Sequence, residues 1–599
     1  MAGEGRDWKR FQRVKISRKD FSKRAKRAEG ATVRHAHKFI VKRWDNIRGV
    51  RRHIIVWMVG VALLISAVGI QMMWFQRSYL SAAPTSGGTY AEGVTGPIGS
   101  LNPLYAVTNA EVAASRLLFS SLYSYDTTGH LKGDLATRMT QDASGKVYTL
   151  SLRSDAKWHD GYDVTAKDVV FTVDLMKNSS TRATNREASY SSWKDIQATA
   201  VSDQTVAFTL PASYASFPQA LTFSVLPEHL LKDVNPGAMR ESSYNNSPIG
   251  SGPFQFSLLQ QIGNEEGRKI VHLNGNTDYY RGTPKLDRLQ LHAYTTNDKV
   301  ATALRTGEIS AAAEVSGDTA RAVDQNRYDI SVKPVNSGVY AIFNTSQPIL
   351  KDTKVRKALQ LGLNTNELRK KIYGNPQRLD LPFVNGQLTG EDIPVAAGFD
   401  QSQAKESLDA DGWVLGSNGI RQKAGEELRL RVVTRKSVEF ERALESLVGQ
   451  WRALGVQVDT QIVDPSEVGQ SFAQAVLKER NYDVLLDELL IGADPDVFAY
   501  WHTQGFLNLA NYSNSVSDDA LASARTRSEP ELRNVKYKAF AKQWLDDVPA
   551  VGLYQSNMLY VRSKTAHSLT QDEKIISAAD RYANVINWTA DNAVVYKTP

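Results

Sequence analysis

The 599-residue sequence contains no cysteine. Disulfide bonds, thiolate metal sites, a cysteine nucleophile and lipid attachment through an N-terminal cysteine are therefore excluded. Histidine is also scarce, with ten dispersed residues and no HExxH pattern, so we expect no dedicated zinc site. The chain is too long for a single hydrophobic core, which predicts two or more lobes.

Positive charge is concentrated at one end of the chain. Residues 1–53 hold 18 Lys and Arg against 5 Asp and Glu, whereas the whole chain has a net charge of +8. The remainder is therefore net negative, and the overall basicity is no argument for nucleic-acid binding. We expect this tail to bind anionic lipid headgroups. A solvated tail that only fixes membrane orientation is the alternative.

One long apolar run, residues 54–75, is broken only by Ser66 and Gln71. As a helix it spans about 33 Å, enough to cross a hydrocarbon core of about 30 Å. The basic residues before it place the N-terminus in the cytoplasm and the main body outside. A cleaved signal peptide fits less well because both the run and the 53-residue lead are too long. We therefore expect a single-pass anchor, followed by a flexible linker at residues 76–88.

The body beyond residue 89 alternates strand and helix patterns. VYTLSLR (147–153) alternates apolar and polar residues, as a half-buried strand does. The segments 164–176 and 440–455 place their apolar residues on one helical face, and 456–463 again has a period of two. Mixed helices and strands over this length predict a large α/β body.

Two motifs in the body resemble catalytic sites without meeting their requirements. His159 and Asp160 are neighbours, and neighbouring side chains in an extended chain point in opposite directions, so adjacency makes no general-base pair. The Gly250-Ser251-Gly252 turn is no nucleophile elbow, because residue 249 is Ile. We therefore predict neither enzymatic activity nor a bound cofactor.

Seven segments follow one another in an order that carries a family resemblance. They are 122–176 (LYSYDTTGHLKGDLATRMTQDASGKVYTLSLRSDAKWHDGYDVTAKDVVFTVDLM), 226–231 (LPEHLL), 247–256 (SPIGSGPFQF), 304–310 (LRTGEIS), 343–359 (FNTSQPILKDTKVRKAL), 511–525 (NYSNSVSDDALASAR) and 548–561 (VPAVGLYQSNMLYV). Together they resemble the extracytoplasmic solute-binding proteins of family 5, the oligopeptide- and dipeptide-binding components of ABC transporters.

The resemblance implies a fold and its division. It implies a two-lobed α/β fold of the periplasmic-binding-protein type II, with a Venus-flytrap cleft and a subdomain inserted in lobe one. Lobe one would comprise residues 89–296, lobe two 297–553, and residues 554–599 would return to lobe one. Such proteins close on their ligand by hinge motion.

The stretch DELLIGADPDVFAYWHTQG (487–505) is the main candidate for a binding site. The resemblance places it in the lobe-two side of the cleft, where peptide-binding members commonly pair an aspartate with the peptide α-ammonium, four residues before a proline. Here that position, counted from Pro495, is Ile491. Either Asp494 or Asp496 substitutes, or the ligand has no free amine there, because a buried unpaired ammonium is costly. The alternative is that both aspartates only cap the following helix.

Aromatic and amide groups complete the predicted cleft wall. The candidates are Tyr500, Trp501, His502 and Gln504 from lobe two, with Asn102 and Tyr105 from lobe one. A core position is the alternative for Trp501. Asp487 and Glu488, which precede the apolar Leu-Leu-Ile run, are interpreted as structural.

These features predict a membrane-tethered solute-binding protein of an ABC importer that captures peptides in an interlobe cleft. The expected partners are the ligand, the permease subunits and the cell membrane through residues 54–75. Two alternatives remain open. One is a binder of a non-peptide solute such as a sugar, an opine or a metal chelate, and the other is a surface sensor or scaffold with the same fold.

Overall fold

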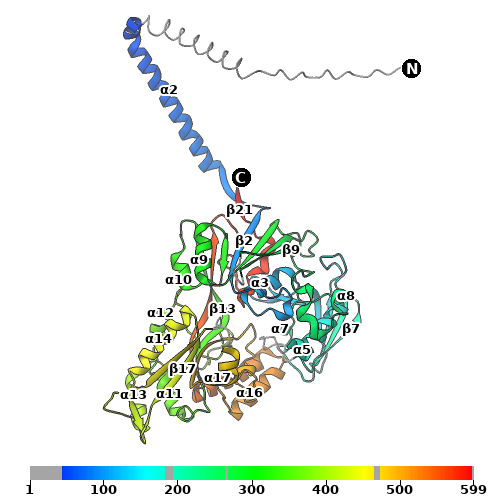
Figure 1. Ribbon diagram of the computed structural model, residues 1–599, viewed down its shortest axis with the longest axis vertical. Helices are drawn as coiled ribbons and strands as arrows, with labels where there is room; N and C mark the ends of the chain where they lie inside the picture. Colours follow the sequence, from blue (N-terminus) through cyan, green and yellow to red (C-terminus); the bar gives the residue numbers. More distant parts are fainter. Residues whose placement is uncertain (1–43, 183–192, 264–267, 465–471, 597–599) are drawn as a thin grey trace, which may run out of the picture. The chain divides into compact units, whose positions relative to one another are not determined.

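The computed structural model describes residues 44–182, 193–263, 268–464 and 472–596 (Figure 1). The chain divides into two compact units, one formed by Met1–Ala83 with Val594–Pro599 and the other by Pro84–Ala593. Most of the basic tail predicted for residues 1–53 lies outside the described residues.

The smaller unit is dominated by one long helix, α2 (Trp44–Tyr79). Its segment Val50–Gln76 is exposed along its length and is apolar and long enough to cross a membrane. The predicted apolar helix is therefore present. Where a flexible linker is predicted for residues 76–88, α2 continues to Tyr79 and strand β1 (Leu80–Thr85) follows. β1 forms a ladder with β21 (Asp591–Tyr596), which supplies hydrogen-bond partners that a free linker lacks.

The larger unit is built around a ten-stranded mixed sheet. Two long antiparallel strands, β13 (Tyr328–Phe343) and β20 (Ala550–Ser563), lie side by side at its centre. Beyond β20 follow β12 (Ala311–Ala313), β2 (Thr89–Thr95), β11 (Arg288–Tyr294), β10 (Lys269–Gly275) and β9 (Phe254–Gln261). Beyond β13 follow β19 (Val484–Leu490), β17 (Arg429–Arg435) and β18 (Gln457–Val463).

The β13–β20 ladder connects two lobes. Residues 328–334 of β13 pair with 557–563 of β20, and residues 338–342 pair with 550–555, with an irregular register between Pro334 and Gly338. In the first part, Tyr560 and Tyr328 belong to two hydrophobic cores, and in the second part Val339 and Tyr340 belong to two other cores. The two strands therefore pass from one lobe into the other (Figure 1).

Lobe one contains α3 (Asn109–Leu118), α9 (Asn297–Thr306) and α10 (Gly317–Ala322). On α9, Val300 and Ala303 pack with Ala91 of β2 and Val561 of β20. This packing places α9 in lobe one, although the predicted boundary of lobe two is at residue 297. We therefore propose that the chain first passes from lobe one to lobe two within β13.

A four-stranded antiparallel sheet forms an inserted layer of lobe one, in the order β5 (Ala136–Gln141), β6 (Val147–Leu152), β8 (Thr205–Thr209), β7 (Gln197–Ser202). β6 alternates between buried and half-buried residues, as predicted for 147–153. Helix α4 (Ala166–Lys177) packs on this sheet, and its start is fixed by a reciprocal capping box between Thr165 and Asp168.

Lobe two carries most of the remaining helices. They are α11 (Thr353–Leu361), α12 (Thr365–Lys370), α13 (Gln401–Ala410), α14 (Val438–Arg452), α15 (Phe498–Trp501), α16 (Ser515–Thr526) and α17 (Pro530–Asp547). The predicted helix at 440–455 is α14, whose apolar stripe, including Phe440, Leu447 and Trp451, is buried against the sheet. The strand predicted at 456–463 is β18.

Shorter elements complete the described chain. They are η2 (Pro103–Tyr105), β3 (Tyr123–Tyr125), β4 (Leu131–Gly133), α5 (Ser179–Arg182), α7 (Phe217–Ala220), α8 (Glu228–Leu231), η3 (Pro236–Glu241), η4 (Ser243–Asn245), β14 (Val414–Leu415), β15 (Arg421–Lys423), β16 (Glu426–Glu427), η5 (Ala473–Lys478) and η6 (Ala578–Asn587).

The element η6 brings the end of the chain back to lobe one. Arg581 in η6 donates two hydrogen bonds to Glu92 Oε1 of β2, at 2.9 and 2.6 Å, and both side chains are buried. Tyr582 and Tyr560 also donate to the Glu92 carboxylate, at 2.6 and 3.1 Å. A buried ion pair is tolerated when such extra hydrogen bonds satisfy it. The pair therefore joins β2 and η6 across 489 positions of the sequence.

Candidate functional site

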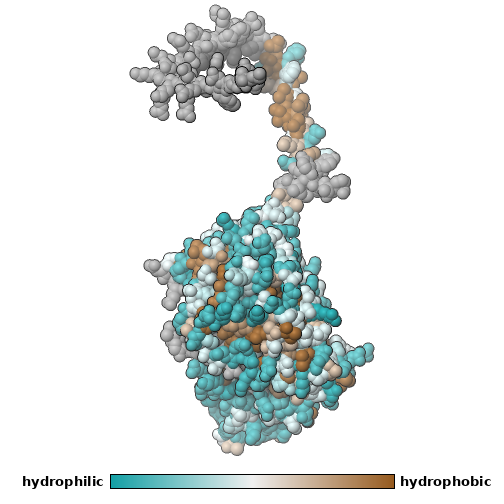
Figure 2. Space-filling view, turned by 90° about the vertical axis from the view of Figure 1, so that its right-hand side faces the viewer, coloured by the Kyte–Doolittle hydropathy of each residue, from teal (hydrophilic) through white to brown (hydrophobic). Residues whose placement is uncertain are grey.

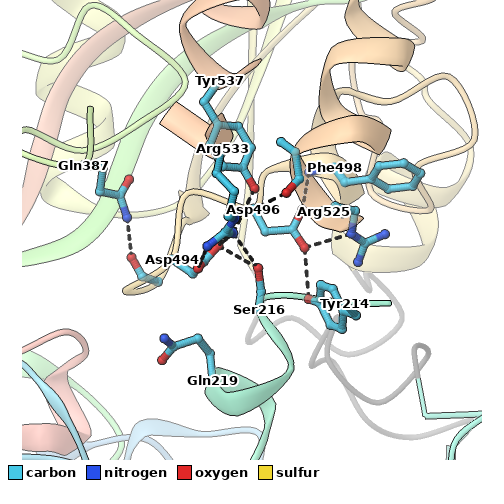
Figure 3. Close-up of polar contacts among 12 residues, drawn as sticks. Tyr214, Ser216, Gln219, Gln387, Asp494, Asp496, Phe498, Arg525, Arg533 and Tyr537 are labelled. Atoms are coloured by element: carbon cyan, nitrogen blue, oxygen red, sulfur yellow. Dashed lines mark hydrogen bonds and ion pairs between the residues drawn. The ribbon is translucent and has the colours of Figure 1, made fainter. Parts of the chain in front are cut away.

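Asp494 and Asp496 lie in the loop between β19 and α15, which faces lobe one (Figure 3). Asp494 forms a two-pronged ion pair with Arg533 of α17, with oxygen–nitrogen distances of 2.6 and 2.9 Å. Ser216 of lobe one donates a hydrogen bond to Asp494 Oδ1 at 2.7 Å, and Arg533 also donates to the Ser216 hydroxyl at 2.9 Å. The three side chains form one closed set of polar contacts across the two lobes.

Asp496 repeats the arrangement with different partners. It accepts a hydrogen bond from Arg525 Nε of α16 at 2.9 Å and from the Tyr214 hydroxyl of lobe one at 2.9 Å. Burial raises the pKa of Asp496 above its ordinary value, while Arg525 lowers it and Asp494 raises it. The Arg525 guanidinium lies over the rings of Tyr214 and Phe498, 4.7 and 4.4 Å from their centres.

We call the six residues Tyr214, Ser216, Asp494, Asp496, Arg525 and Arg533 the interlobe latch. Backbone contacts reinforce it, because Ala215 N donates to Arg525 O at 2.9 Å and Ser213 Oγ donates to Thr526 O at 3.1 Å. Both carboxylates already have an arginine partner. This arrangement favours a role in holding the lobes together over a role as a free acceptor for an ammonium group.

The alternative of helix capping applies in part to one aspartate. Asp496 Oδ1 accepts a hydrogen bond from the backbone N–H of Phe498, the first residue of α15, at 3.3 Å. No such bond to α15 is recorded for Asp494 within the described residues. Asp496 therefore combines a weak cap with its ion pair, whereas Asp494 contacts α17 and lobe one.

The predicted aromatic group does not converge on one space. Trp501 is 2% exposed and packs edge-on against Tyr340 and Trp544 in the core of lobe two, so its alternative core position is the one observed. The Tyr500 hydroxyl donates to the backbone oxygen of Leu490 at 2.6 Å. These side chains are close together in the sequence but point in different directions, because each residue of a helix is rotated by about 100° from the one before it.

His502 and Gln504 lie at the margin of this region. The His502 ring stacks on Phe498 with ring centres 3.9 Å apart, and its Nδ1 accepts a hydrogen bond from the backbone N–H of Gln504. Burial lowers the pKa of His502, while Asp518 raises it. The side chain of Gln504 is exposed.

Asn102 and Tyr105 are buried in lobe one. Asn102 caps η2 by accepting a hydrogen bond from Leu104 N at 3.1 Å, and its amide donates to Asn245 at 3.0 Å. Tyr105 is 6% exposed, and the guanidinium of Arg240 lies 4.7 Å from its ring centre. These contacts explain both residues as parts of the lobe-one framework, and their role in binding stays a prediction.

Glu314 and Glu439 were not singled out in the sequence, whereas Glu488 was interpreted there as structural. Glu488 lies opposite Val339 of β13 in the ladder and accepts a hydrogen bond from Ser337 Oγ at 2.6 Å. Glu439 lies in the first turn of α14, and Glu314 follows β12 with a left-handed backbone, φ 55°. Glu488 belongs to the stretch 487–505 that was singled out in the sequence. The other two glutamates lie in segments far from that stretch, and no motif there indicated a binding role.

A metal site would need several ligating side chains around one point. Within the ranges that the structure describes, no group of three or more His, Cys, Asp or Glu side chains is placed to hold a metal ion. The described polar contacts of the site are the ion pairs and hydroxyl hydrogen bonds of the interlobe latch.

Comparison with known proteins gives a family match over most of the body. Residues 130–508 match the model of the bacterial extracellular solute-binding proteins, family 5 Middle. The oligopeptide-binding protein AppA of Bacillus subtilis (strain 168) is 25% identical over 525 residues, which cover 85% of this chain and 94% of AppA.

Solved structures give the fold. AppA from Bacillus subtilis in complex with a nonapeptide superposes with a TM-score of 0.70 at 24% identity, covering 85% of this chain and 99% of AppA. NikZ from Campylobacter jejuni in complex with Ni(L-His) gives a TM-score of 0.71 at 24% identity, covering 84% and 99% of the two chains. The predicted two-lobed type II fold is confirmed.

Proposed function

The chain belongs to the bacterial extracellular solute-binding proteins of family 5, and from this premise we propose that it captures peptides between its lobes for an ABC importer. Binding would be non-covalent, in keeping with a family of solute-binding proteins. An extended peptide satisfies its backbone by pairing with a strand edge, while pockets receive its side chains.

The observation that carries this proposal is the interlobe latch. Hydroxyls of lobe one bind carboxylates of lobe two that are themselves fixed by arginines, so the contact is made only when the lobes lie together. The β13–β20 ladder, with its irregular register, provides the connection about which the lobes can turn. A ligand that contacts both lobes shifts the population toward the closed form.

Helix α2 supports a membrane tether. Figure 2 shows hydrophobic residues along α2, whereas the surface of the larger unit is mostly hydrophilic. A 27-residue apolar helix that is exposed along its length avoids water by entering a bilayer. An uncleaved anchor would keep the binding body at the outer surface and raise its local concentration near the permease. The basic tail would contact anionic lipids on the cytoplasmic side.

The experiment that tests peptide capture is thermal unfolding of the full chain in detergent with a pool of di- to octapeptides. A ligand that binds the folded state stabilises it, so we expect the Tm to rise with peptide concentration. The same mass of free amino acids is the control and should leave the Tm unchanged. No shift with any peptide would contradict the proposed function.

A second candidate is a non-peptide solute such as a metal chelate. Ile491 occupies the position at which the family resemblance leads us to expect an amine-binding aspartate, and NikZ, a structural neighbour, was solved with Ni(L-His). The same unfolding experiment with Ni²⁺ and L-histidine together distinguishes the two. A shift with this mixture and none with peptides would favour the chelate.

A further inference from the structure

The β13–β20 ladder is interrupted where its strands pass between the lobes. Regular pairing ends at Pro334 and resumes at Gly338, so that residues 335–337 of β13 lie opposite Ser556 alone. Extra residues in one strand of an antiparallel pair form a bulge, which bends the strand and leaves backbone groups without partners in the ladder. We call residues 335–337 the hinge bulge, because their other hydrogen bonds determine how the two lobes are connected.

Asn336, the middle residue of the hinge bulge, is bonded to both lobes. Its backbone N–H donates to Ile576 O of lobe one at 2.8 Å. Its backbone oxygen accepts hydrogen bonds from the N–H groups of Ile491 and Gly492 in lobe two, at 3.0 and 2.9 Å. Its side-chain amide donates to Gly492 O at 3.0 Å. Asn336 therefore holds the segment after β19 with its backbone and its side chain while it contacts lobe one.

The Ile576 carbonyl belongs to a segment that is anchored in lobe one. Lys574 N donates to Thr127 O, between β3 and β4, at 2.8 Å. The buried Lys333, in the lobe-one part of β13, donates from its Nζ to Glu573 O at 2.8 Å. The oxygen that accepts the Asn336 N–H is therefore fixed relative to lobe one.

Gly492 begins the loop that carries both latch aspartates. Its φ of 80° lies in the left-handed region, which glycine adopts without steric cost. Its carbonyl oxygen accepts a second hydrogen bond, from Gln387 Nε2 at 2.8 Å (Figure 3). Asp494 follows two residues later, a span of at most about 7 Å, so a displacement of Gly492 is passed on to the Asp494 carboxylate.

These contacts form a ring that begins and ends in lobe one. From Ile576 the ring runs through Asn336 to Gly492. The loop then leads to Asp494, whose carboxylate accepts a hydrogen bond from the Ser216 hydroxyl of lobe one at 2.7 Å. The Asn336–Ile576 bond and the Ser216–Asp494 bond both cross between the lobes. Because the segment that joins them is short and fixed at Gly492, both bonds form at the same angle between the lobes.

We propose that Asn336 is a positioning residue that couples the hinge bulge to the interlobe latch. By holding Gly492, it places Asp494 within reach of Ser216 when its own bond to Ile576 is made. The proposal rests on the closing of the lobes in the proposed function, and it adds the residue that makes the hinge and latch contacts form together. It requires no contact between Asn336 and the ligand.

The test is a double-mutant cycle, measured as the distance between two spin labels in the full chain in detergent without ligand. The chain has no cysteine, so Ser144→Cys in lobe one and Ser417→Cys in lobe two create two unique labelling sites, both exposed. Pulsed electron paramagnetic resonance gives the ratio of molecules with the separation of this structure to molecules with opened lobes. The cycle combines Asn336→Ala, which removes the amide donor, with Ser216→Ala in the latch.

We expect Asn336→Ala to lower the ratio of closed to open molecules by about threefold and Ser216→Ala to lower it by about tenfold. The ratio of the double variant should be close to that of Ser216→Ala alone, whereas independent effects would multiply to about thirtyfold. A multiplied effect, an unchanged ratio in Asn336→Ala, or a single separation that no variant shifts would overturn the coupling.

Asn364→Ala is the matched control. Asn364 is another half-buried asparagine of lobe two, and its side chain accepts hydrogen bonds from two backbone N–H groups at the start of α12, each at 3.1 Å. This variant should lower the Tm and leave the ratio unchanged. Asn336→Asp, which keeps the size of the side chain but lacks the amide donor, replaces Asn336→Ala in the cycle if the alanine variant does not fold, and should lower the ratio in the same direction.

The measurement separates the coupling from peptide capture, because no peptide is present. An overturned coupling leaves peptide capture standing. A failure of every peptide to raise the Tm contradicts peptide capture and leaves the outcome of the cycle unaffected.

Discussion

Ser216 and Tyr214 are the lobe-one members of the interlobe latch, and each donates to a carboxylate whose arginine partner lies in lobe two. Their hydroxyls can be removed without disturbing either ion pair. A hydrogen bond to a charged group contributes about 1.5–3 kcal/mol. Tyr214→Phe removes one such bond, and Ser216→Ala removes the bond to Asp494 and the bond from Arg533. Both losses penalise the closed form and leave the open form unchanged.

We therefore expect Ser216→Ala and Tyr214→Phe each to weaken ligand binding by about tenfold, mainly through faster dissociation. Surface plasmon resonance with a peptide that shifts the Tm measures both rates. Ser144→Ala is the control, since Ser144 is exposed and its hydroxyl contacts Asp142 within lobe one. If Ser216→Ala behaved like this control, the latch would have no part in closure.

Glu439 gives a prediction for pH. Its pKa is raised to about 6 by burial, first of all, and by Glu488, while Tyr554 and Arg435 oppose the rise. The folded ligand-free protein therefore holds this proton more tightly than the unfolded chain, whose glutamates titrate near 4.3. That contribution to stability is complete below about pH 4 and is lost as the pH rises through about 6.

Glu439→Gln should accordingly flatten the fall in stability between about pH 4 and 7, by about 1–2 kcal/mol. Urea unfolding at several pH values, without ligand, measures this difference. The exposed control Glu445→Gln should retain the wild-type slope. An unchanged slope in Glu439→Gln would contradict the assignment.

At the scale of single residues, the sequence located the acidic loop but could not assign its contacts. Arg525 and Arg533 lie 29 and 39 residues from their aspartates, and Tyr214 and Ser216 lie 282 and 278 residues away. Such pairs depend on how the two lobes fold and meet. Trp501 was ambiguous for a related reason, because an aromatic residue at the end of a short helix suits both a core and a cleft.

At the scale of elements, Gly338 occupies the irregular part of the β13–β20 ladder. A Cβ at this position would clash with Leu379 Cδ2 and lie 2.9 Å from Tyr340 Cε2. Both neighbours are buried in the lobe-two core and have little room to move. Close approach of side chains to the backbone therefore requires glycine here.

Gly338→Ala should lower the free energy of unfolding by about 1–3 kcal/mol through overpacking. Gly449→Ala is a matched control in α14, where a Cβ would meet nothing within 4 Å and alanine favours the helix by up to about 1 kcal/mol. Guanidinium unfolding compares the two. A Gly338→Ala variant as stable as wild type would show that the neighbouring side chains can move to make room for the added Cβ atom.

Periodicity was sufficient to predict α14, β6 and β18, because one face of each is buried and the pattern is local. It was insufficient for β1, whose partner strand β21 lies about 500 residues away in the sequence. The point at which the chain first passes between the lobes was also not predictable from periodicity. Packing with Ala91 and Val561 assigns α9 to lobe one, and the sequence has no boundary signal there.

At the scale of the whole molecule, the two-lobed fold was predictable from the order of family segments and not from composition alone. The buried Glu92–Arg581 pair fixes the end of the chain to lobe one, although no motif around either residue predicts the pair. The proposed function then follows from two lobes, a connecting ladder and a latch that forms on closure.

The most direct test of this account is mass spectrometry of the ligand released from the full chain after purification from its native membrane. We expect short peptides, enriched over the detergent blank and over the same membranes lacking the protein. Recovery of a sugar, an opine or a metal chelate in place of peptides would contradict it.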